Sequence, residues 1–210
     1  ADFVGLGFDL AFKYQNPAMI LADGIVGQMM EKVVLPPFKP RRTEEEVRQE
    51  CPWGTTGKLP NRKRNIITSL ALEAEVMENI NLKLQAKYRE IEKNEVRFET
   101  HHCEDADYVL VAFGSIARIC EKAMEMAREE GYKVGVLRPI TLFPFPTNPI
   151  KELSKKVKGF LTVEMSAGQM VEDVRLTVNG AVPVEFYGRM GGIVPSAEEI
   201  LAALKEKLIK

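Results

Sequence analysis

The chain has 210 residues, of which 45% are hydrophobic and 28% are charged, an ordinary globular composition that is long enough for one domain and a sizeable appendage. Its net charge of −1 gives no basic field that would attract nucleic acid or an anionic membrane surface. No apolar run approaches the ~18 to 20 residues that a membrane-spanning helix needs, so we expect a cytoplasmic protein.

Three cysteines and two histidines limit the metal sites that the chain can build. Cys51, Cys103 and Cys120 are too few and too scattered for a disulfide framework or a Cys-x-x-Cys cluster site, so any iron-sulfur or structural zinc centre is expected on another chain. His101 and His102 stand beside Cys103, but neighbours in an extended strand point to opposite faces. We therefore predict no metal site here.

The first part of the chain has the pattern of a helix followed by a buried strand. Apolar residues recur at helical spacing from Phe3 to Tyr14, Asn16-Pro17 stops that helix, and Ala18–Leu21 is typical of a buried strand. No second strand is predicted before Arg97, although a strand needs neighbours that satisfy its backbone. The strand either docks on a later sheet or belongs to a domain whose earlier part has been removed, and we favour the second.

Residues 36–65 are rich in proline and charge and have no sustained apolar period, apart from a short helix predicted from Thr43 to Gln49. A connection this long usually marks a linker or a binding loop, and we expect it to cover a neighbouring domain or subunit. Trp53 either contacts such a partner or tucks onto the chain's own surface, and we favour the local contact.

Two short segments resemble cofactor motifs and fail on inspection. Gly54 to Lys58 looks like the end of a phosphate-binding loop, but that motif needs glycine where Pro52 stands and serine or threonine where Leu59 stands. Asp23-Gly24 looks like the start of the Gly-Asp-Gly diphosphate motif of thiamine enzymes, but Ala22 precedes it and no Asn-Asn pair follows. We predict neither an ATP site nor a metal-diphosphate site in these segments.

Residues Thr68 to Val96 predict a long amphipathic helix with charged residues away from one apolar stripe. The stripe comprises Leu70, Met77, Ile80, Leu84, Tyr88 and Ile91. It spans too few heptads for a coiled coil, so we interpret the helix as a brace that links two domains. Arg97 to His101 is expected to form an edge strand that leads into the main sheet.

From Tyr108 onward the chain repeats a β-α unit four times. The expected strands are Tyr108–Phe113, Lys133–Leu137, Phe160–Glu164 and Val182–Tyr187. The expected helices are Ile116–Glu130, Ile150–Val157, Met170–Val178 and a last one that opens with a capping box of Ser196 and Glu199. Unalternating apolar strands separated by helices predict an α/β fold, an open, doubly wound parallel sheet with helices on both faces.

The carboxyl ends of these strands predict where a ligand would lie, because the crevice of a doubly wound sheet is outside those ends. The candidate residues there are Gly114, Ser115, Arg138, Glu164, Gln169 and Arg189. Gly114 permits a sharp turn and Ser115 is expected to cap the helix that follows. A dinucleotide is disfavoured, because the glycine fingerprint is absent and Arg138 replaces an acidic ribose binder. Arg189 predicts either an anion contact or an arginine that reaches across a subunit interface.

Several segments resemble the alpha subunit of 2-oxoacid:ferredoxin oxidoreductases, in particular the 2-ketoisovalerate (branched-chain) type. They are Val111–Arg118, Gly135–Pro146 and Val163–Arg175, continued by Tyr187–Gly192 and by Ile20–Glu31 near the start. The resemblance covers nearly the whole chain. It is specific for the family and less so for the substrate.

The resemblance implies three parts: residues 1–35 as the remnant of a pyrimidine-binding thiamine domain, 36–105 as a linker and long helix, and 106–210 as a transketolase C-terminal-like domain. The complete enzyme would convert 2-ketoisovalerate, coenzyme A and oxidised ferredoxin into isobutyryl-CoA, CO2 and reduced ferredoxin. Thiamine diphosphate and Mg would lie in the full complex and iron-sulfur clusters on other chains, with beta, gamma and iron-sulfur subunits and ferredoxin as partners. The resemblance places no catalytic residue in this chain, which would serve architecture, subunit contacts and the approach to the active site.

Two other interpretations stay open. The chain could be a binding module without catalysis, whose strand-end crevice holds an anion such as the phosphates of coenzyme A through Gly114, Ser115, Arg138 and Arg189. It could also be an unrelated scaffold, which requires the strand predicted at Ala18–Leu21 to pair within this chain.

Overall fold

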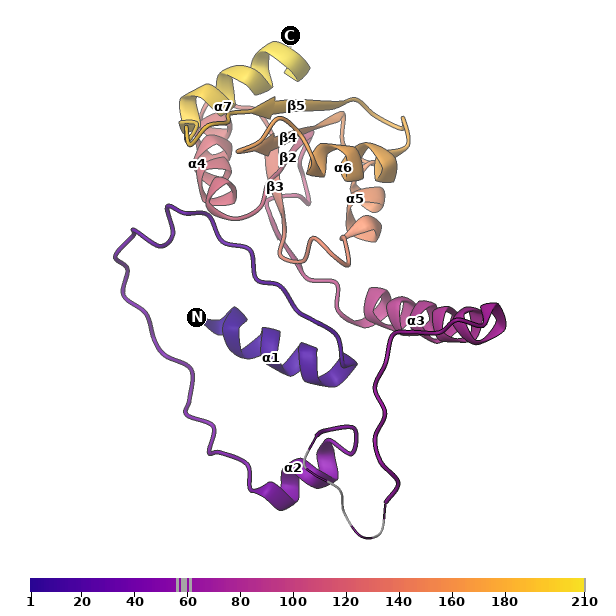
Figure 1. Ribbon diagram of the computed structural model, residues 1–210. Coiled ribbons are helices and arrows are strands. Elements are labelled where there is room, and N and C mark those ends of the chain that lie inside the picture. The colour runs from indigo at the N-terminus through magenta and orange to yellow at the C-terminus, as the bar shows by residue number, and fades with distance from the viewer. Residues whose placement is uncertain (56, 58–59, 61, 210) are drawn as a thin grey trace. The chain divides into compact units, whose positions relative to one another are not determined.

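The computed structural model describes residues 1–55, 57, 60 and 62–209 and divides the chain into two compact units. Unit 1 comprises Ala1–Ile20 and Glu31–Lys87, and unit 2 comprises Leu21–Met30 and Tyr88–Lys210. All strands of the described chain belong to unit 2, where they form one sheet (Figure 1). None of the described helices is long and apolar enough to cross a bilayer.

The sheet of unit 2 has five strands in the order β1-β3-β2-β4-β5. They are β1 (Phe98–His101), β2 (Tyr108–Val111), β3 (Val134–Pro139), β4 (Gly159–Glu164) and β5 (Val184–Gly188). Strands β2 to β5 are parallel, while β1 pairs antiparallel with β3 at the edge. The predicted parallel sheet and its added edge strand are confirmed.

Two helices cover each face of the sheet (Figure 1). Helices α4 (Ser115–Glu129) and α7 (Ala197–Leu204) pack together on one face, and α7 continues into a π-helical turn, η1 (Lys205–Ile209). Helices α5 (Thr147–Leu153) and α6 (Met170–Val178) pack together on the other face. The sheet is therefore doubly wound, with helices on both of its faces, as predicted.

The central strands are buried on both faces, which explains their unalternating apolar sequences. Leu110 in β2 is aligned with Val136 in β3 and Leu161 in β4, and all three belong to the core beneath α4 and α7. Val109 and Phe160 belong to the core beneath α5 and α6. All five side chains are 0% exposed, so these positions pack against the helix layers and the neighbouring strands.

Thr162 is a polar exception inside β4. It is fully buried, and its hydroxyl has no hydrogen-bond partner among the described residues. Burying an unpaired hydroxyl is costly, so we expect Thr162→Val to raise the free energy of unfolding by about 1 kcal/mol in urea denaturation. Thr162→Ser keeps the hydroxyl and removes a buried methyl group, so it should lower that free energy by about 0.8 kcal/mol. A valine variant no more stable than the unmutated chain would contradict the unpaired state.

The strand predicted at Ala18–Leu21 is absent, and this prediction was wrong. These residues have no regular secondary structure and are exposed, Met19 by 82% and Leu21 by 67%. They pair with no strand of the described chain, so their backbone belongs to no ladder. The unrelated scaffold that required this pairing is contradicted with it.

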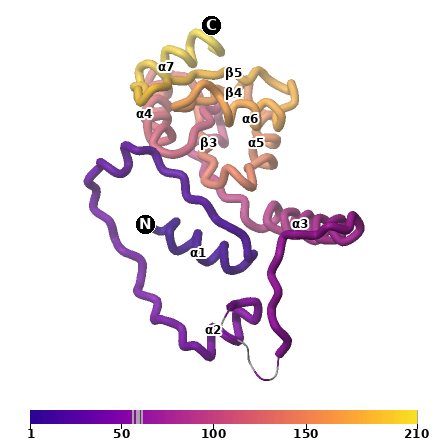
Figure 2. Tube along the Cα trace, in the orientation of Figure 1, coloured from indigo at the N-terminus to yellow at the C-terminus, as the bar shows by residue number. Residues whose placement is uncertain are grey.

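Helices α1 and α2 of unit 1 begin and end close to the predicted residues. Helix α1 (Asp2–Tyr14) ends before Asn16-Pro17 as expected. Helix α2 (Glu44–Glu50) opens with a capping box in which Thr43 and Glu46 satisfy each other's backbone N–H groups. Figure 2 shows the long irregular path between these helices, in which residues 29–43 have no regular secondary structure.

Trp53 packs locally, as favoured from the sequence. Its ring lies 6.1 Å from that of Phe12, and the Arg42 guanidinium lies 5.4 Å over the same Phe12 ring. The Arg62 guanidinium donates to the carbonyls of Pro52 and Gly57. Thr56, Lys58 and Leu59, which belong to the phosphate-loop lookalike, lie outside the described residues.

Helix α3 (Ala74–Asn94) begins six residues later than predicted. The Thr68 hydroxyl accepts from the Leu70 N–H (3.1 Å), a local bond that competes with helix formation. Leu70 therefore lies outside the helix and is exposed. Ile91 is the one buried residue in α3, so the stripe is less buried than predicted, and its role as a brace stays a prediction.

Proline residues explain two further differences in unit 2. Helix α5 begins at Thr147, three residues before the predicted start, because Pro149 is tolerated in a first helical turn, and it ends at Leu153, four residues before the predicted end. Strand β5 begins at Val184 and not at Val182, because Pro183 has no N–H to donate to the ladder. Strand β2 also ends at Val111, two residues before the predicted Phe113.

Candidate functional site

The six candidate residues lie at the carboxyl edge of the sheet, at four different strand ends. Gly114 and Ser115 follow β2, Arg138 stands near the end of β3, and Arg189 follows β5. Glu164 ends β4, and Gln169 precedes α6 in the loop that follows it. Strands β2 and β4 are neighbours whose connections leave toward opposite faces, so their ends meet at the switch point of the sheet, where ligands of such folds bind.

Helix α4 is capped differently from the prediction. Gly114 occupies the cap position with φ 63°, and Ser115 is the first helical residue, so the predicted serine cap was wrong by one position. The Ser115 hydroxyl is buried without a partner in the described chain. Its backbone N–H donates instead to the carboxylate of Asp23 (2.9 Å), so a residue 92 positions away caps this helix.

Glu164 is buried, with 4% of its surface exposed, and its carboxylate caps helix α6. Its oxygens accept from the backbone N–H groups of Gln169, Met170 and Val171 and from the hydroxyl of Ser166, at 3.0 to 3.3 Å. The side chain of Gln169 is exposed. The carboxylate is thus committed to its own helix, a role that the strand-end pattern did not indicate.

The two candidate arginines both have carboxylate partners. The Arg138 guanidinium donates to Glu99 (2.8 Å), its register partner on β1, although its Nε is buried without a partner among the described residues. The Arg189 guanidinium donates to Glu199 in α7 (2.5 Å). A hydrogen bond with Tyr187, followed by the charge of Glu199, raises the pKa of Arg189 above its ordinary value.

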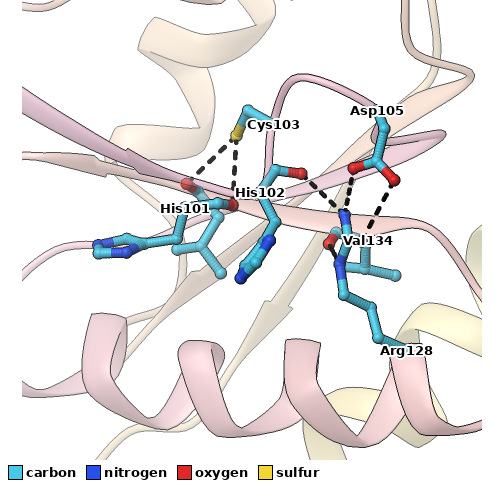
Figure 3. Close-up of polar contacts among 7 residues, drawn as sticks. His101, His102, Cys103, Asp105, Arg128 and Val134 are labelled. Carbon is cyan, nitrogen blue, oxygen red and sulfur yellow. Dashed lines mark hydrogen bonds and ion pairs between the residues drawn. The ribbon is translucent and has the colours of Figure 1, made fainter.

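The segment that suggested a metal site lies at the opposite edge of the sheet, between β1 and the start of β2 (Figure 3). The Arg128 guanidinium donates there to Asp105, to the carbonyl of His102 and to the carbonyl of Val134. The hydrogen bond from Arg128 to its carboxylate holds the pKa of Asp105 below its ordinary value. No group of three or more His, Cys, Asp or Glu in the described part of the chain is placed to hold a metal ion.

Cys103 is expected to react slowly with iodoacetamide. Its thiol is buried near the carbonyls of Val136 (3.3 Å) and His101 (3.7 Å), and burial raises its pKa to about 11 (Figure 3). Two pKa units lower the thiolate fraction at pH 8 about 100-fold, and only the thiolate attacks. Mass spectrometry of the Cys103 peptide should show labelling at least that much slower than in urea-unfolded chain, rising up to pH 11. Equal rates in the two states would contradict the burial.

Unit 1 contains an open hollow of about 490 Å³. Within it, the ammonium of Lys39 pairs with Asp9 and the guanidinium of Arg42 with Glu50. The described lining has no histidine, and its single thiol, Cys51, is buried. We find no pair of nucleophile and base in this hollow.

The chain is similar to several known proteins. Residues 106–200 match the family "Pyruvate:ferredoxin oxidoreductase core domain II". Ketoisovalerate oxidoreductase subunit VorB from Methanothermobacter marburgensis is 44% identical over 199 residues, which are 95% of this chain and 54% of the relative. 2-Oxoglutarate synthase subunit KorA from Methanocaldococcus jannaschii is 30% identical over 220 residues, 97% of this chain and 59% of the relative. The chain thus spans a little over half the length of these relatives.

A solved structure is similar in fold. It is a 2-oxoglutarate:ferredoxin oxidoreductase from Magnetococcus marinus, with a TM-score of 0.53 and 19% identity, and the match covers 65% of this chain and 24% of that one. At this identity the likeness supports the fold alone. The family match and the relatives above confirm the resemblance stated from the sequence motifs. Residues 106–200 therefore form a domain of the pyruvate:ferredoxin oxidoreductase core domain II family, and the chain is similar over most of its length to subunits of ketoisovalerate oxidoreductase and 2-oxoglutarate synthase.

Proposed function

We propose that this chain is part of the alpha subunit of a 2-oxoacid:ferredoxin oxidoreductase that acts on 2-ketoisovalerate. The observation that carries the proposal is the 44% identity to a ketoisovalerate oxidoreductase subunit over 95% of this chain. Subunits named for 2-oxoglutarate are 28 to 30% identical over comparable lengths. A pyruvate synthase subunit is 33% identical over 51% of this chain. This difference in identity favours the branched-chain substrate.

The complete reaction would turn 2-ketoisovalerate, coenzyme A and oxidised ferredoxin into isobutyryl-CoA, CO2 and reduced ferredoxin. Two electrons leave the substrate and pass singly to ferredoxin, while the acyl group moves to the thiol of coenzyme A. Thiamine diphosphate would supply the means to cleave the bond to the carboxylate. Residues 1–35, 36–105 and 106–210 would be the remnant of the thiamine domain, the linker with the long helix, and the transketolase C-terminal-like domain.

This chain would contribute architecture and subunit contacts to that reaction. Its relatives are nearly twice as long, so much of each such subunit has no counterpart here. Its three cysteines are buried and scattered, which suits iron-sulfur clusters that are held by other subunits. We therefore place the thiamine diphosphate, its Mg ion and the clusters in the full complex, with beta, gamma and iron-sulfur subunits and ferredoxin as partners.

The alternative of an anion-binding or coenzyme A-binding module has less support from the geometry. Arg138 and Arg189 already pair with Glu99 and Glu199, and the N–H of Ser115 already donates to a carboxylate. An anion would have to displace these partners. We therefore prefer the subunit assignment.

The proposal is tested on the native complex that contains this chain, purified from its source under non-denaturing conditions. We expect native mass spectrometry to show partner subunits with iron-sulfur clusters. Reduction of ferredoxin with coenzyme A should have a kcat/KM for 2-ketoisovalerate about tenfold or more above that for 2-oxoglutarate or pyruvate. If the enzyme uses 2-oxoglutarate or pyruvate as well as 2-ketoisovalerate or better, the substrate assignment is refuted. If the chain is isolated without partner subunits, its assignment as a subunit is refuted. For that case, calorimetry with coenzyme A, repeated on Arg138→Ala and Arg189→Ala, tests the alternative.

A further inference from the structure

The segment Leu21–Met30, here called the strap, belongs to unit 2, although the residues on both sides of it belong to unit 1. It is folded as a compact turn. The N–H of Val26 donates to the carbonyl of Asp23 (3.0 Å), and the N–H groups of Gln28 and Met29 donate to the carbonyl of Ile25 (3.0 and 3.1 Å). The strap is therefore a small element docked on the sheet unit.

Little apolar burial holds the strap in place. Five of its apolar side chains are exposed, from 39% at Ile25 to 101% at Met30. The hydrophobic effect scales with the apolar area removed from water, so these residues contribute little to docking. A polar contact must therefore account for much of the free energy that docks the strap.

That contact is the bond between the Asp23 carboxylate and the N–H of Ser115, at 2.9 Å. The first N–H groups of a helix have no partner within the helix and carry its positive dipole end, so a carboxylate is favourable there. Helix α4 has 15 residues and no side-chain cap from its own cap position, and Asp23 fills this need.

The turn after β2 is shaped for this carboxylate. Gly114 has φ +63°, and a Cβ atom on it would stand 2.9 Å from the Asp23 Oδ2 atom, closer than real Cβ contacts allow. A side chain at this position would thus displace Asp23. Glycine serves the turn and the docked carboxylate together.

We propose that Asp23 is the latch that docks the strap on the N-terminus of helix α4, and that removing its carboxylate releases the strap without unfolding the sheet. The docked strap occupies the anion-favouring end of α4 at the switch point, so an external anion reaches that N–H only after release. This inference rests on the contacts of unit 2 alone and holds whether or not the proposed function is correct.

The test measures amide hydrogen exchange by NMR on the 210-residue chain, in the unmutated form and as Asp23→Ala and Asp23→Asn. We expect the Ser115 amide to exchange about fivefold or more faster in Asp23→Ala, the factor that loss of a typical cap gives. Amides of Val26 and Met29 should exchange faster with it, while those of β4 stay unchanged. Asp23→Asn keeps an acceptor oxygen without the charge, so its Ser115 amide should exchange at a rate between those of the unmutated chain and of Asp23→Ala. Glu92→Ala, which removes a carboxylate from α3, is the matched control and should change none of these.

Unchanged exchange at Ser115 in Asp23→Ala overturns the proposal. If exchange in Asp23→Ala rises throughout, including β4, the exchange rates of the Ser115 and β4 amides are compared in Asp23→Asn instead. An unchanged rate at Ser115 in that variant also refutes the proposal. A rise that includes β4 in both variants also refutes it, because the carboxylate would then hold the fold and not the strap.

Discussion

Replacing Glu164 by alanine is expected to lower the free energy of unfolding by about 3 kcal/mol, since hydrogen bonds to charged groups contribute about 1.5 to 3 kcal/mol. The carboxylate accepts from three backbone N–H groups at the start of α6 and from the Ser166 hydroxyl. Two of those N–H groups belong to the buried residues Met170 and Val171, so water replaces the lost acceptor poorly. Urea denaturation followed by circular dichroism measures the loss.

Two variants distinguish the capping of α6 by Glu164 from a simple loss of negative charge. Glu164→Gln keeps the size but turns an acceptor into a donor that faces other donors, so we expect a loss of about 2 kcal/mol. Glu172→Ala removes an exposed carboxylate from the first turn of the same helix and should cost about 0.5 kcal/mol, the contribution of its interaction with the helix dipole. If Glu164→Ala costs no more than Glu172→Ala, the buried cap does not carry the stability assigned to it.

The sheet could be predicted because its information is local. The run Phe160–Glu164 is apolar apart from Thr162 and Glu164, and it lies in β4 because a strand buried on both faces favours apolar residues without alternation. The capping box of Ser196 and Glu199 likewise opens α7 as predicted, since all its atoms lie within four residues. Both predictions depended on neighbours in the sequence.

The failures depended on residues that are distant in the sequence. Ala18–Leu21 has the composition of a strand, but a strand forms only beside another, and none stands there in the described chain. The cap of α4 comes from Asp23, so the sequence around Ser115 alone pointed to the wrong residue. In both cases the deciding partner is tertiary.

The candidate site divides in the same way. Its position at the strand ends followed from the β-α order and the rule that ligands lie outside the carboxyl ends. The partners of its residues did not follow, because Glu99 and Glu199 pair with Arg138 and Arg189 only once the elements are packed. A glutamate at the end of an apolar strand, six positions before the first residue of a helix and followed by the small residues Ser166, Ala167 and Gly168, is the signal that would have indicated the cap formed by Glu164.

The two helix N-termini at the switch point are each capped by a carboxylate of this chain. Asp23 caps α4 and Glu164 caps α6. Each carboxylate occupies the place where an anionic ligand would be attracted. The edge is therefore arranged to hold its own loops in position, which agrees with the architectural role proposed for this chain.

Gly188→Ala is expected to destabilise unit 2 by about 2 to 3 kcal/mol, the upper part of the usual cost of overpacking a well-packed region. A Cβ atom at this position, the end of β5, would stand 2.4 Å from both the Phe186 ring and the carbonyl oxygen of Ser166. A ring can rotate, but the carbonyl belongs to the loop after β4. The bonds from Ser166 to Glu164 and from Gly168 to Ser166 hold that loop, so relief of the clash has to break the cap of α6.

Urea denaturation of three chains tests this reasoning. Gly5→Ala is the control, because a Cβ there meets nothing within 4 Å, and in helix α1 it should stabilise by about 0.5 to 1 kcal/mol. Gly188→Ala combined with Phe186→Leu removes the contact with the ring and leaves the contact with the Ser166 carbonyl. If the carbonyl decides the cost, this double variant recovers less than half of the lost stability. Full recovery of the free energy of unfolding would show that the Phe186 ring alone set the requirement for glycine. The loop after β4 would then move away from the added Cβ atom without a loss of stability.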